Sequence, residues 1–273
     1  MGRLKRTIKN TIAKTGFAVT RLKNTKVEGQ EVPSEDYLRH TDGTTNYYET
    51  PIGNYFLPND APDDVVINSM KKGYYFEKHI ITIAERYIKE GSAVLDIGAN
   101  FGQMSICFAK ISGMLGKVYS FDADDYVYTF LLKNIRANGC LNIEPIFGAV
   151  YNELGKTVHF PKQDFIRFGS YGSYGLNPLN NEGRKVKTIT IDSLDIKRHI
   201  SFMKVDIQGS DLFALQGAVN TINRNKMPII FEFEQQFQED FNTTFQDYVD
   251  FAEQISYRFQ EVVGDVNYLL LPK

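Results

Sequence analysis

The fold of this chain is decided by the stretch VLDIGANFGQ, residues 94–103. An apolar run leads into it, and an amphipathic segment, MSICFAK, follows. Between them lie Gly98, Ala99 and Gly102, the pattern of a buried strand that turns tightly into a helix. Glycine allows a ligand to approach the backbone closely, and the first turn of a helix offers unpaired N–H groups. The stretch therefore predicts a loop that receives part of a nucleotide-like ligand.

The spacing of the glycines indicates which class of ligand such a loop binds. A dinucleotide fingerprint reads G-x-G-x-x-G, but Asn100 stands at its middle glycine, which disfavours NAD. The G-K-[ST] of a Walker loop is absent as well. The form D-x-G-x-x-x-G, which begins at Asp96, suits a ligand without phosphates.

Asp122 supports this interpretation. It ends the next predicted strand, 26 residues after Asp96. A carboxylate there can accept hydrogen bonds from two ribose hydroxyls. An aspartate at a strand end is often only structural, but the glycine loop beside this one favours ribose binding.

From residue 93 onward, predicted strands and helices alternate. The strands are AVLDIG (93–98), KVYSFDA (117–123), NIEPIFGAV (142–150), ISFMKVDIQG (200–209) and PIIFEFE (228–234), and the helices cover 103–110, 126–138, 211–222 and 245–256. Two last strands, RFQEVV (258–263) and VNYLLLP (266–272), form a C-terminal antiparallel hairpin. This order predicts an α/β fold with a mostly parallel seven-stranded sheet and helices on both faces. Ligands bind beyond the carboxyl ends of such strands.

The N-terminal part differs in charge from the rest. Residues 1–26 hold eight of the 31 Lys and Arg residues and no acidic residue, which leaves 23 basic against 33 acidic residues elsewhere. Leu4, Ile8 and Ile12 recur every four residues, which predicts a basic amphipathic helix that lies on an anionic membrane or docks on a partner. A solvated arm is the alternative.

We expect two parts in the chain: a basic N-terminal arm and linker over 1–45, and one domain over 46–273. The domain begins with a hairpin in YYETPIGNYFLP (47–58), followed by a helix that ends before Gly91. It also contains a loop insertion over 160–183, followed by a predicted strand, KVKTITI (185–191). A loop this long inside a compact domain is usually functional or disordered.

Composition excludes several classes of protein. No apolar run reaches the ~18 residues of a membrane span, and the N-terminus lacks the apolar region of a secretory signal. Cys107 and Cys140 make neither a disulfide framework nor a metal site, and no spacing of acidic residues resembles a metal-ligand motif. We expect a cytoplasmic protein without a metal. Peripheral contact with the inner face of the membrane through residues 1–26 is a further hypothesis.

Four motifs in order resemble those of one family. LDIGANFGQMSICFAK, VYSFDADDYVYTFLLKNIRANG, ITIDSLD with MKVDIQGSDLFALQGA, and MPIIFEFE are similar to segments of the FkbM family of S-adenosylmethionine-dependent methyltransferases, which are class I and Rossmann-like. The resemblance spans roughly residues 47–263. It implies S-adenosyl-L-methionine as the cofactor. The residues that it implies for binding are Asp96, Gly98, Asn100 and Gly102 in the loop, Asp122 at the ribose, Ala149 near the adenine, and Glu77 at the methionyl ammonium. Glu77 has an equal alternative as a solvated carboxylate at a helix start.

The chain departs from the family's later signature, K-x-D-x-E-G-x-E. Gln208 stands where a Glu is usual, and Asp211 stands where the second Glu is usual. A hydroxyl acceptor must lose its proton, and our candidate base is Asp206 at the end of the fourth strand. Lys204 lies on the same side of that strand and either lowers the pKa of Asp206 or binds the acceptor. A structural ion pair is the alternative for these two residues.

Other candidates are weaker. His159 and His199 are the remaining candidate bases. Phe165, Phe168, Tyr171, Tyr174 and Asn177 in the 160–183 insertion suit either a sugar-binding surface or a lid with buried rings.

The sequence thus predicts an O-methyltransferase that acts on a hydroxyl of a sugar, glycan or small natural product. One alternative is a non-catalytic, degenerate Rossmann-like binding protein, which the Gln208 departure suggests. The other is a nucleic-acid methyltransferase, which the acidic domain disfavours.

Overall fold

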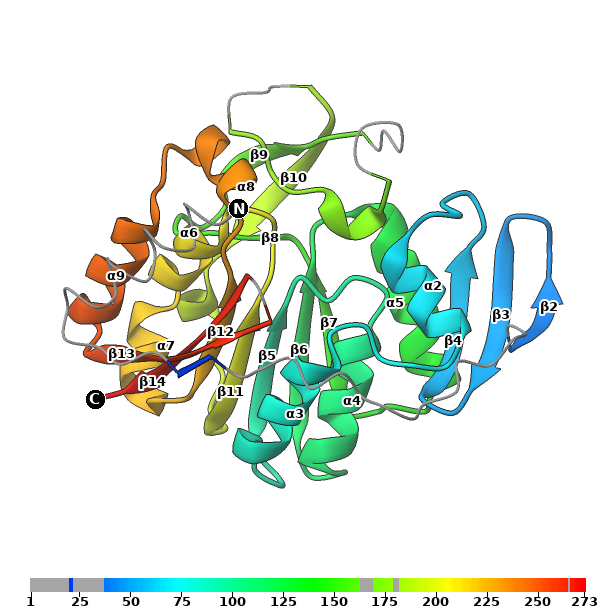
Figure 1. Ribbon diagram of the computed structural model, residues 1–273, viewed down its shortest axis with the longest axis horizontal. Coiled ribbons are helices and arrows are strands. Elements are labelled where there is room, and N and C mark those ends of the chain that lie inside the picture. The colour runs from blue at the N-terminus through cyan, green and yellow to red at the C-terminus, as the bar shows by residue number, and fades with distance from the viewer. Residues whose placement is uncertain (1–19, 22–36, 163–168, 179–181, 265) are drawn as a thin grey trace.

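The computed structural model describes residues 20–21, 37–162, 169–178, 182–264 and 266–273 (Figure 1). Its main sheet has the order β1-β13-β14-β12-β11-β5-β6-β7. The strands are β1 (Thr20–Arg21), β5 (Ala93–Ile97), β6 (Lys117–Asp122), β7 (Ile143–Phe147), β11 (Ile200–Val205), β12 (Ile229–Glu232), β13 (Tyr257–Val263) and β14 (Asn267–Pro272). Seven of these are the predicted strands, and β13 and β14 form the predicted antiparallel hairpin. The short β1 adds a parallel edge beside β13.

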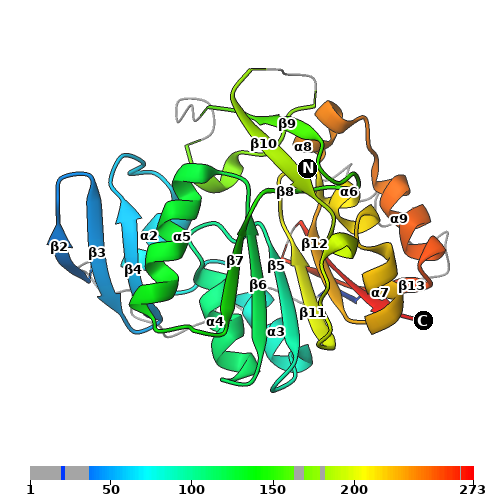
Figure 2. The same ribbon diagram turned by 180° about the vertical axis from the view of Figure 1, so that it is seen from behind.

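The side chains of the central strands alternate between two cores. Val94 of β5 packs among α3 (Lys78–Tyr87), α4 (Gln103–Ser112) and α5 (Asp125–Ala137). Leu95 faces the other way, toward α6 (Asp211–Gln216), α7 (Val219–Asn225) and α9 (Phe245–Gln254). Both faces of the sheet are therefore covered by helices, as Figures 1 and 2 show, which explains why β5 and β11 are buried along their whole length. The predicted α/β architecture is confirmed.

Two predicted elements are broken in the structure. The helix expected over 211–222 is two helices, α6 and α7, because Asp192 interrupts the helical hydrogen bonds: its N–H donates to the Gly217 carbonyl oxygen at 2.9 Å, and its carboxylate accepts the Thr221 N–H at 2.7 Å. The strand expected over 142–150 ends at Phe147, since Gly148 has a φ of +154°. The chain then continues as β8 (Ala149–Val150) in a second sheet, with β10 (Arg184–Ile189) between β8 and β9 (Thr157–Phe160).

A third sheet lies at the N-terminal side of the domain. The predicted hairpin is present as β3 (Thr45–Thr50) and β4 (Gly53–Pro58). The segment expected to be linker contributes a further strand, β2 (Leu38–Thr41), and an additional helix, α2 (Val65–Lys71), follows β4. Asn134 of α5 accepts a hydrogen bond from the Phe56 N–H at 2.6 Å, which fastens β4 to the main domain.

The basic amphipathic helix expected around Leu4, Ile8 and Ile12 lies outside the described residues. Cys107 and Cys140 are buried and unbridged, as expected. Within the described parts of the chain, no helix has both the length and the apolar character needed to cross a bilayer.

Candidate active site

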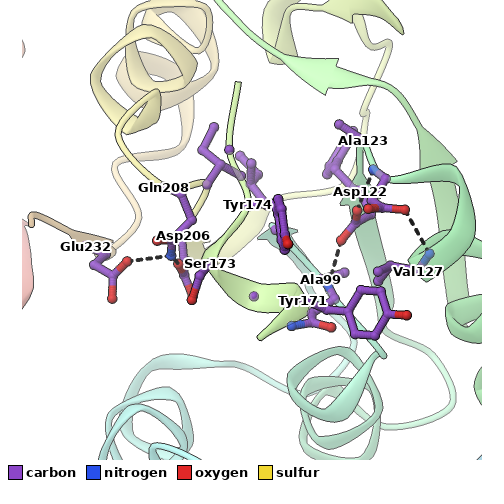
Figure 3. A pocket seen from close by; sticks show the side chains of 18 of the residues that line it. Ala99, Asp122, Ala123, Val127, Tyr171, Ser173, Tyr174, Asp206, Gln208 and Glu232 are labelled. Carbon is purple, nitrogen blue, oxygen red and sulfur yellow. Dashed lines mark hydrogen bonds between the residues drawn. The ribbon is translucent and has the colours of Figure 1, made fainter. Parts of the chain in front are cut away.

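A cavity of about 420 Å³ opens at the carboxyl ends of β5, β6, β11 and β12, where an open α/β sheet binds its ligands (Figure 3). Seven of the nine residues implied by the sequence line it: Glu77, Gly98, Asn100, Asp122, Ala149, Lys204 and Asp206. Asp96 and Gly102 do not line it. The order of the strands in the sheet therefore brings residues that are distant in sequence together in this cavity.

The glycines of the opening loop are required by neighbouring protein atoms. Gly98 has a φ of +84°, and an added Cβ would collide with the carbonyl oxygen of Asp206. Gly102 has a φ of +88°, and its Cβ would lie 2.7 Å from Leu131 Cδ1. Sequence reasoning attributed these glycines to the approach of a ligand. In the structure they allow the loop to pack against the end of β11 and against α5.

Asp122 lies at the end of β6 and faces the cavity. Its Oδ2 accepts a hydrogen bond from the Asn100 N–H at 2.8 Å, and its Oδ1 accepts one from the Asp124 N–H at 2.9 Å. A carboxylate oxygen has two lone pairs, so each oxygen keeps one for a further donor. Burial raises the pKa of Asp122 to about 7, although the two backbone hydrogen bonds oppose the shift.

Asp96 lies beneath the loop and is fully buried. Its Oδ2 accepts a hydrogen bond from Ser105 Oγ at 2.5 Å, and Lys204 Nζ lies 3.9 Å from its Oδ1. Burial raises the pKa of Asp96. Its contacts support the loop and Lys204, and it does not reach the cavity as the resemblance implied.

The other end of the cavity carries a chain of hydrogen bonds between polar side chains. Lys204 Nζ donates to Asp206 Oδ2 at 3.0 Å, so the predicted pair does share one side of β11. Gln208 Nε2 donates to Asp206 Oδ1 at 3.1 Å and to Glu232 Oε2 at 2.9 Å. The amide therefore bridges two carboxylates, which a glutamate at position 208 would repel. Figure 3 shows this bridge across the cavity from Asp122.

Glu232 is a candidate functional residue that sequence reasoning missed. It ends β12, which lies beside β11, and its side chain is half-buried in the cavity wall. Burial, together with the negative charge of Asp206, raises the pKa of Glu232 well above its usual value. Its position could have identified it from the sequence, because it ends a predicted parallel strand that follows the strand carrying Asp206.

Asp211 serves the loop that carries Gln208. It is buried, and its carboxylate accepts the N–H groups of Ile207 at 3.3 Å and Gly209 at 3.1 Å. The Asp that replaces the usual second Glu of the signature is thus a support for the loop after β11.

Glu77 reaches the cavity from the start of α3. Its Oε1 accepts a hydrogen bond from Asn267 Nδ2 at 2.9 Å, and burial raises its pKa to about 7. Its backbone has a φ of +51°, which is unfavourable for a residue with a side chain. Asn100 and Gln208 share this feature and also line the cavity. Such local strain is common where side chains are held for function.

The described part of the 160–183 insertion forms one wall of the cavity. Ser170 Oγ and the Tyr171 N–H donate to Asp64 Oδ2 at 2.9 and 2.8 Å, and Asp64 also caps α2. The rings of Tyr171 and Tyr174 are buried against the cavity. Asn177 instead donates to Asp240 at 2.9 Å. Phe165 and Phe168 lie outside the described residues.

The two candidate histidines lie away from the cavity. His159 is in β9, where it pairs with Lys185, and His199 precedes β11 at its amino end. Neither residue lines the cavity, so the carboxylates are its candidate bases.

The carboxylates predict how stability depends on pH. Glu77, Asp122 and Asp211 each have a pKa raised to about 7, against about 4 in an unfolded chain. Between these values the folded protein holds protons that the unfolded chain has released, so the free energy of unfolding falls as pH rises from 4 to 7. We expect the ligand-free protein to melt at least about 3 °C higher at pH 6 than at pH 8.

Thermal unfolding followed by circular dichroism measures this effect. Glu77→Gln should raise the melting temperature at pH 8 and flatten the dependence, and Glu85→Gln, on the exposed side of the same helix, should change neither. Burial lowers the pKa of His79, so this one group makes the free energy of unfolding rise with pH. The three carboxylates outweigh it. A melting temperature that stays constant or rises from pH 6 to pH 8 would contradict the prediction.

Comparison with known families gives the site its context. Residues 96–259, more than half of the chain, match the methyltransferase FkbM domain. The chain belongs to the FkbM methyltransferase family. Its mostly parallel sheet agrees with the fold that the sequence motifs implied, and the match includes the whole run from Asp96 through Glu232. No curated protein matches this FkbM methyltransferase in sequence.

Solved structures that resemble the FkbM methyltransferase are distant in sequence. Methyltransferase FkbM from Methylobacillus flagellatus KT is 15% identical with a TM-score of 0.43, over 70% of this chain and 49% of that chain. This chain therefore spans about half the length of that relative. A SAM dependent methyltransferase from Aquifex aeolicus is 16% identical with a TM-score of 0.40, over 77% and 93%. TYW2 from M. jannaschii, solved in complex with AdoMet, is 12% identical with a TM-score of 0.42, over 85% and 86%.

Proposed function

We propose that this FkbM-family enzyme transfers a methyl group from S-adenosyl-L-methionine to a hydroxyl of a sugar, glycan or small natural product. One observation carries the proposal: a single cavity joins the Asp122 carboxylate at one end to the Asp206–Gln208–Glu232 group at the other. When bound, the cofactor would supply a methyl group on a positively charged sulfur. Asp122 would accept the two ribose hydroxyls through its remaining lone pairs, and Ala149 would lie near the adenine.

The charges that line the cavity fit this cofactor. Glu77, Asp206, Glu232 and Glu234 line the end opposite Asp122, and Lys204 is the only basic residue among the described residues of the lining. A sulfonium and an ammonium group are both cations, so this end of the cavity suits them, with Glu77 at the ammonium. Burial alone would lower the pKa of Lys204, but the carboxylates of Asp206 and Asp96 raise it, so Lys204 stays charged.

The carboxylates also supply a base for the acceptor. Displacement at a methyl group needs the acceptor oxygen in line with the carbon–sulfur bond, so positioning is a large part of catalysis. Asp206 accepts one hydrogen bond on each oxygen, from Lys204 and from Gln208, and the second lone pair of each oxygen remains for the acceptor hydroxyl. Glu232 accepts a hydrogen bond from Gln208, and burial together with the charge of Asp206 raises its pKa, which makes its carboxylate a stronger proton acceptor than an exposed glutamate. We propose Glu232 as the base and Asp206 with Lys204 as the groups that bind and orient the acceptor.

Substitution separates these two roles. We expect Glu232→Gln to lower kcat about 100-fold or more, the typical loss of a general base, with the affinity for S-adenosyl-L-methionine within about threefold of wild type. Asp206→Asn should mainly raise KM for the acceptor. The assay is transfer of a labelled methyl group to a panel of sugars, glycans and polyhydroxylated natural products, with Glu253→Gln on the surface of α9 as the control. Equal loss in both variants would contradict the assignment.

The proposal fails if isothermal titration detects no binding of S-adenosyl-L-methionine or S-adenosylhomocysteine. Binding without transfer to any hydroxyl compound would favour the alternative of a degenerate binding protein. A nucleic-acid acceptor is disfavoured because the described lining of the cavity carries one basic side chain, whereas phosphate binding needs several.

The remaining proposals concern the rest of the chain. We propose a cytoplasmic enzyme with a basic arm and linker over 1–45 and a methyltransferase domain over 46–273. Residues 1–26 would give peripheral contact with an anionic membrane. Deletion of these residues should reduce liposome binding, and unchanged partitioning would remove the hypothesis.

A further inference from the structure

The most exposed large apolar side chains gather at one edge of the domain. Met114, Leu115 and Leu141 are 77, 75 and 83% exposed, more than any other large apolar side chain in the described residues. They lie in the α4–β6 and α5–β7 loops, at the amino ends of two neighbouring parallel strands. We call these three residues the apolar crest. The α4–β6 and α5–β7 loops lie at the lower side of the sheet in Figure 2, and the cavity opens at the carboxyl ends of the strands.

Hydrogen bonds hold the loops of the crest together. Asn142 Nδ2 donates to the carbonyl oxygens of Ala109 at 2.9 Å and Gly113 at 3.0 Å, which joins the α5–β7 loop to the end of α4. Arg198 Nη1 donates to the carbonyl oxygens of Leu115 and Gly91, both at 2.6 Å. The crest is therefore a fixed feature of the surface and not a set of loose loop ends.

The proposed methyl transfer does not explain the crest. Cofactors and substrates of such sheets bind at the carboxyl ends of the strands, and the crest lies at the amino ends. Scattered single apolar residues on a surface are ordinary, but a group of them marks a contact surface. Each of these side chains would stabilise a contact that removed it from water.

The charge around the crest indicates the partner. Four segments form this edge: residues 88–92, 110–117, 136–144 and 195–199. They carry six basic residues, Lys89, Lys110, Lys117, Arg136, Lys197 and Arg198, against three acidic ones, Glu90, Glu144 and Asp195. Lys117 pairs with Glu144 and Lys197 pairs with Asp195, so the excess of positive charge comes from the other four basic residues against Glu90. This excess of positive charge occurs in a chain whose net charge is −2. Lys and Arg around exposed Leu and Met side chains complement an anionic lipid surface.

We propose that the apolar crest docks on the surface of an anionic bilayer. Met114, Leu115 and Leu141 enter the boundary between headgroups and acyl chains, and Lys89 and Lys197 face the headgroups. The cavity, at the opposite edge, then opens away from the bilayer. This contact uses a different surface from residues 1–26 and does not depend on which cofactor or acceptor the enzyme binds.

Flotation of the full chain with vesicles tests the proposal. Wild type should bind vesicles of mixed phosphatidylglycerol and phosphatidylcholine, and bind pure phosphatidylcholine vesicles at least tenfold more weakly. The variant Met114→Ser/Leu115→Ser/Leu141→Ser should bind the anionic vesicles at least tenfold more weakly than wild type. Lys89→Glu/Lys197→Glu should lose binding as well and reduce its dependence on salt. Leu38→Ser/Leu154→Ser, at exposed apolar positions away from the crest, is the matched control and should bind like wild type.

Three results would overturn the proposal. The first is wild-type protein that ignores anionic vesicles, and the second is a triple variant that binds them like wild type. The third is light scattering that shows a wild-type dimer and a monomeric triple variant, because the crest would then be an interface between two copies. Unchanged thermal unfolding of the variants shows that they are folded, since all the altered side chains are exposed.

Discussion

Replacement of Asp122 by alanine should lower the affinity for S-adenosyl-L-methionine by about 100-fold. Hydrogen bonds to a charged group contribute roughly 1.5–3 kcal/mol each, and the proposed ribose contact contains two of them. Asp122 is placed for this contact because Asn100 and Asp124 use only one lone pair on each of its oxygens. Isothermal titration at pH 8, where the carboxylate is ionised, measures the effect.

Two controls separate binding from folding in this experiment. Asp122→Asn keeps the size of the side chain and one acceptor, so its affinity should fall between those of wild type and the alanine variant. Asp195→Asn changes an exposed aspartate far from the cavity and should leave the affinity unchanged. If Asp122→Ala binds the cofactor within threefold of wild type while its circular dichroism is native, Asp122 does not hold the ribose.

Replacement of Gly98 by alanine should destabilise the fold by about 3 kcal/mol or more. A residue with a side chain in the left-handed region costs roughly 1–2 kcal/mol, and overpacking adds roughly 1–3 kcal/mol. Both costs apply at Gly98, whose φ is +84° and whose added Cβ would collide with the backbone of Asp206. Urea denaturation measures the difference in the free energy of unfolding.

Gly155 provides a matched control for this substitution. Its φ is +76°, but an added Cβ would meet nothing within 4 Å. Gly155→Ala should therefore cost only the backbone term, about 1–2 kcal/mol. Equal destabilisation by the two substitutions would show that the contact between the loop and β11 contributes nothing, and that Gly98 is required only for its backbone conformation.

Local patterns in the sequence were sufficient for most of the architecture. The short, mostly apolar run Ala93–Ile97, bounded by Gly91 and Gly98, predicted a buried strand, and helical periodicity identified α3 and α9 without knowledge of their neighbours. The order of strands and helices then left few topologies for the sheet. The predictions failed where a break depends on a distant contact, as at Gly217, whose carbonyl oxygen accepts the Asp192 N–H.

The end of the cavity that holds Asp122 could also be predicted from segments that follow one another along the chain. Asp122 and the loop from Gly98 to Gly102 follow successive strands, and successive parallel strands usually lie side by side. Asp96 was expected at the bound cofactor, and in the structure it is buried and does not line the cavity. Whether a carboxylate at a strand end faces the cavity or the sheet interior depends on how the loop above it packs.

The end of the cavity that holds Gln208 and Glu232 depended on tertiary structure. Gln208 and Glu232 are 24 residues apart and meet only because β11 and β12 are neighbours, and Asp64 holds Ser170 across 106 residues. The raised pKa values of Glu77 and Glu232 arise from burial and from nearby charges, which no short segment contains. Residue order encodes periodicity and turns, because these depend on a few neighbouring residues. The pKa shifts and the contacts between distant side chains depend on which segments pack together, so only the tertiary structure determines them.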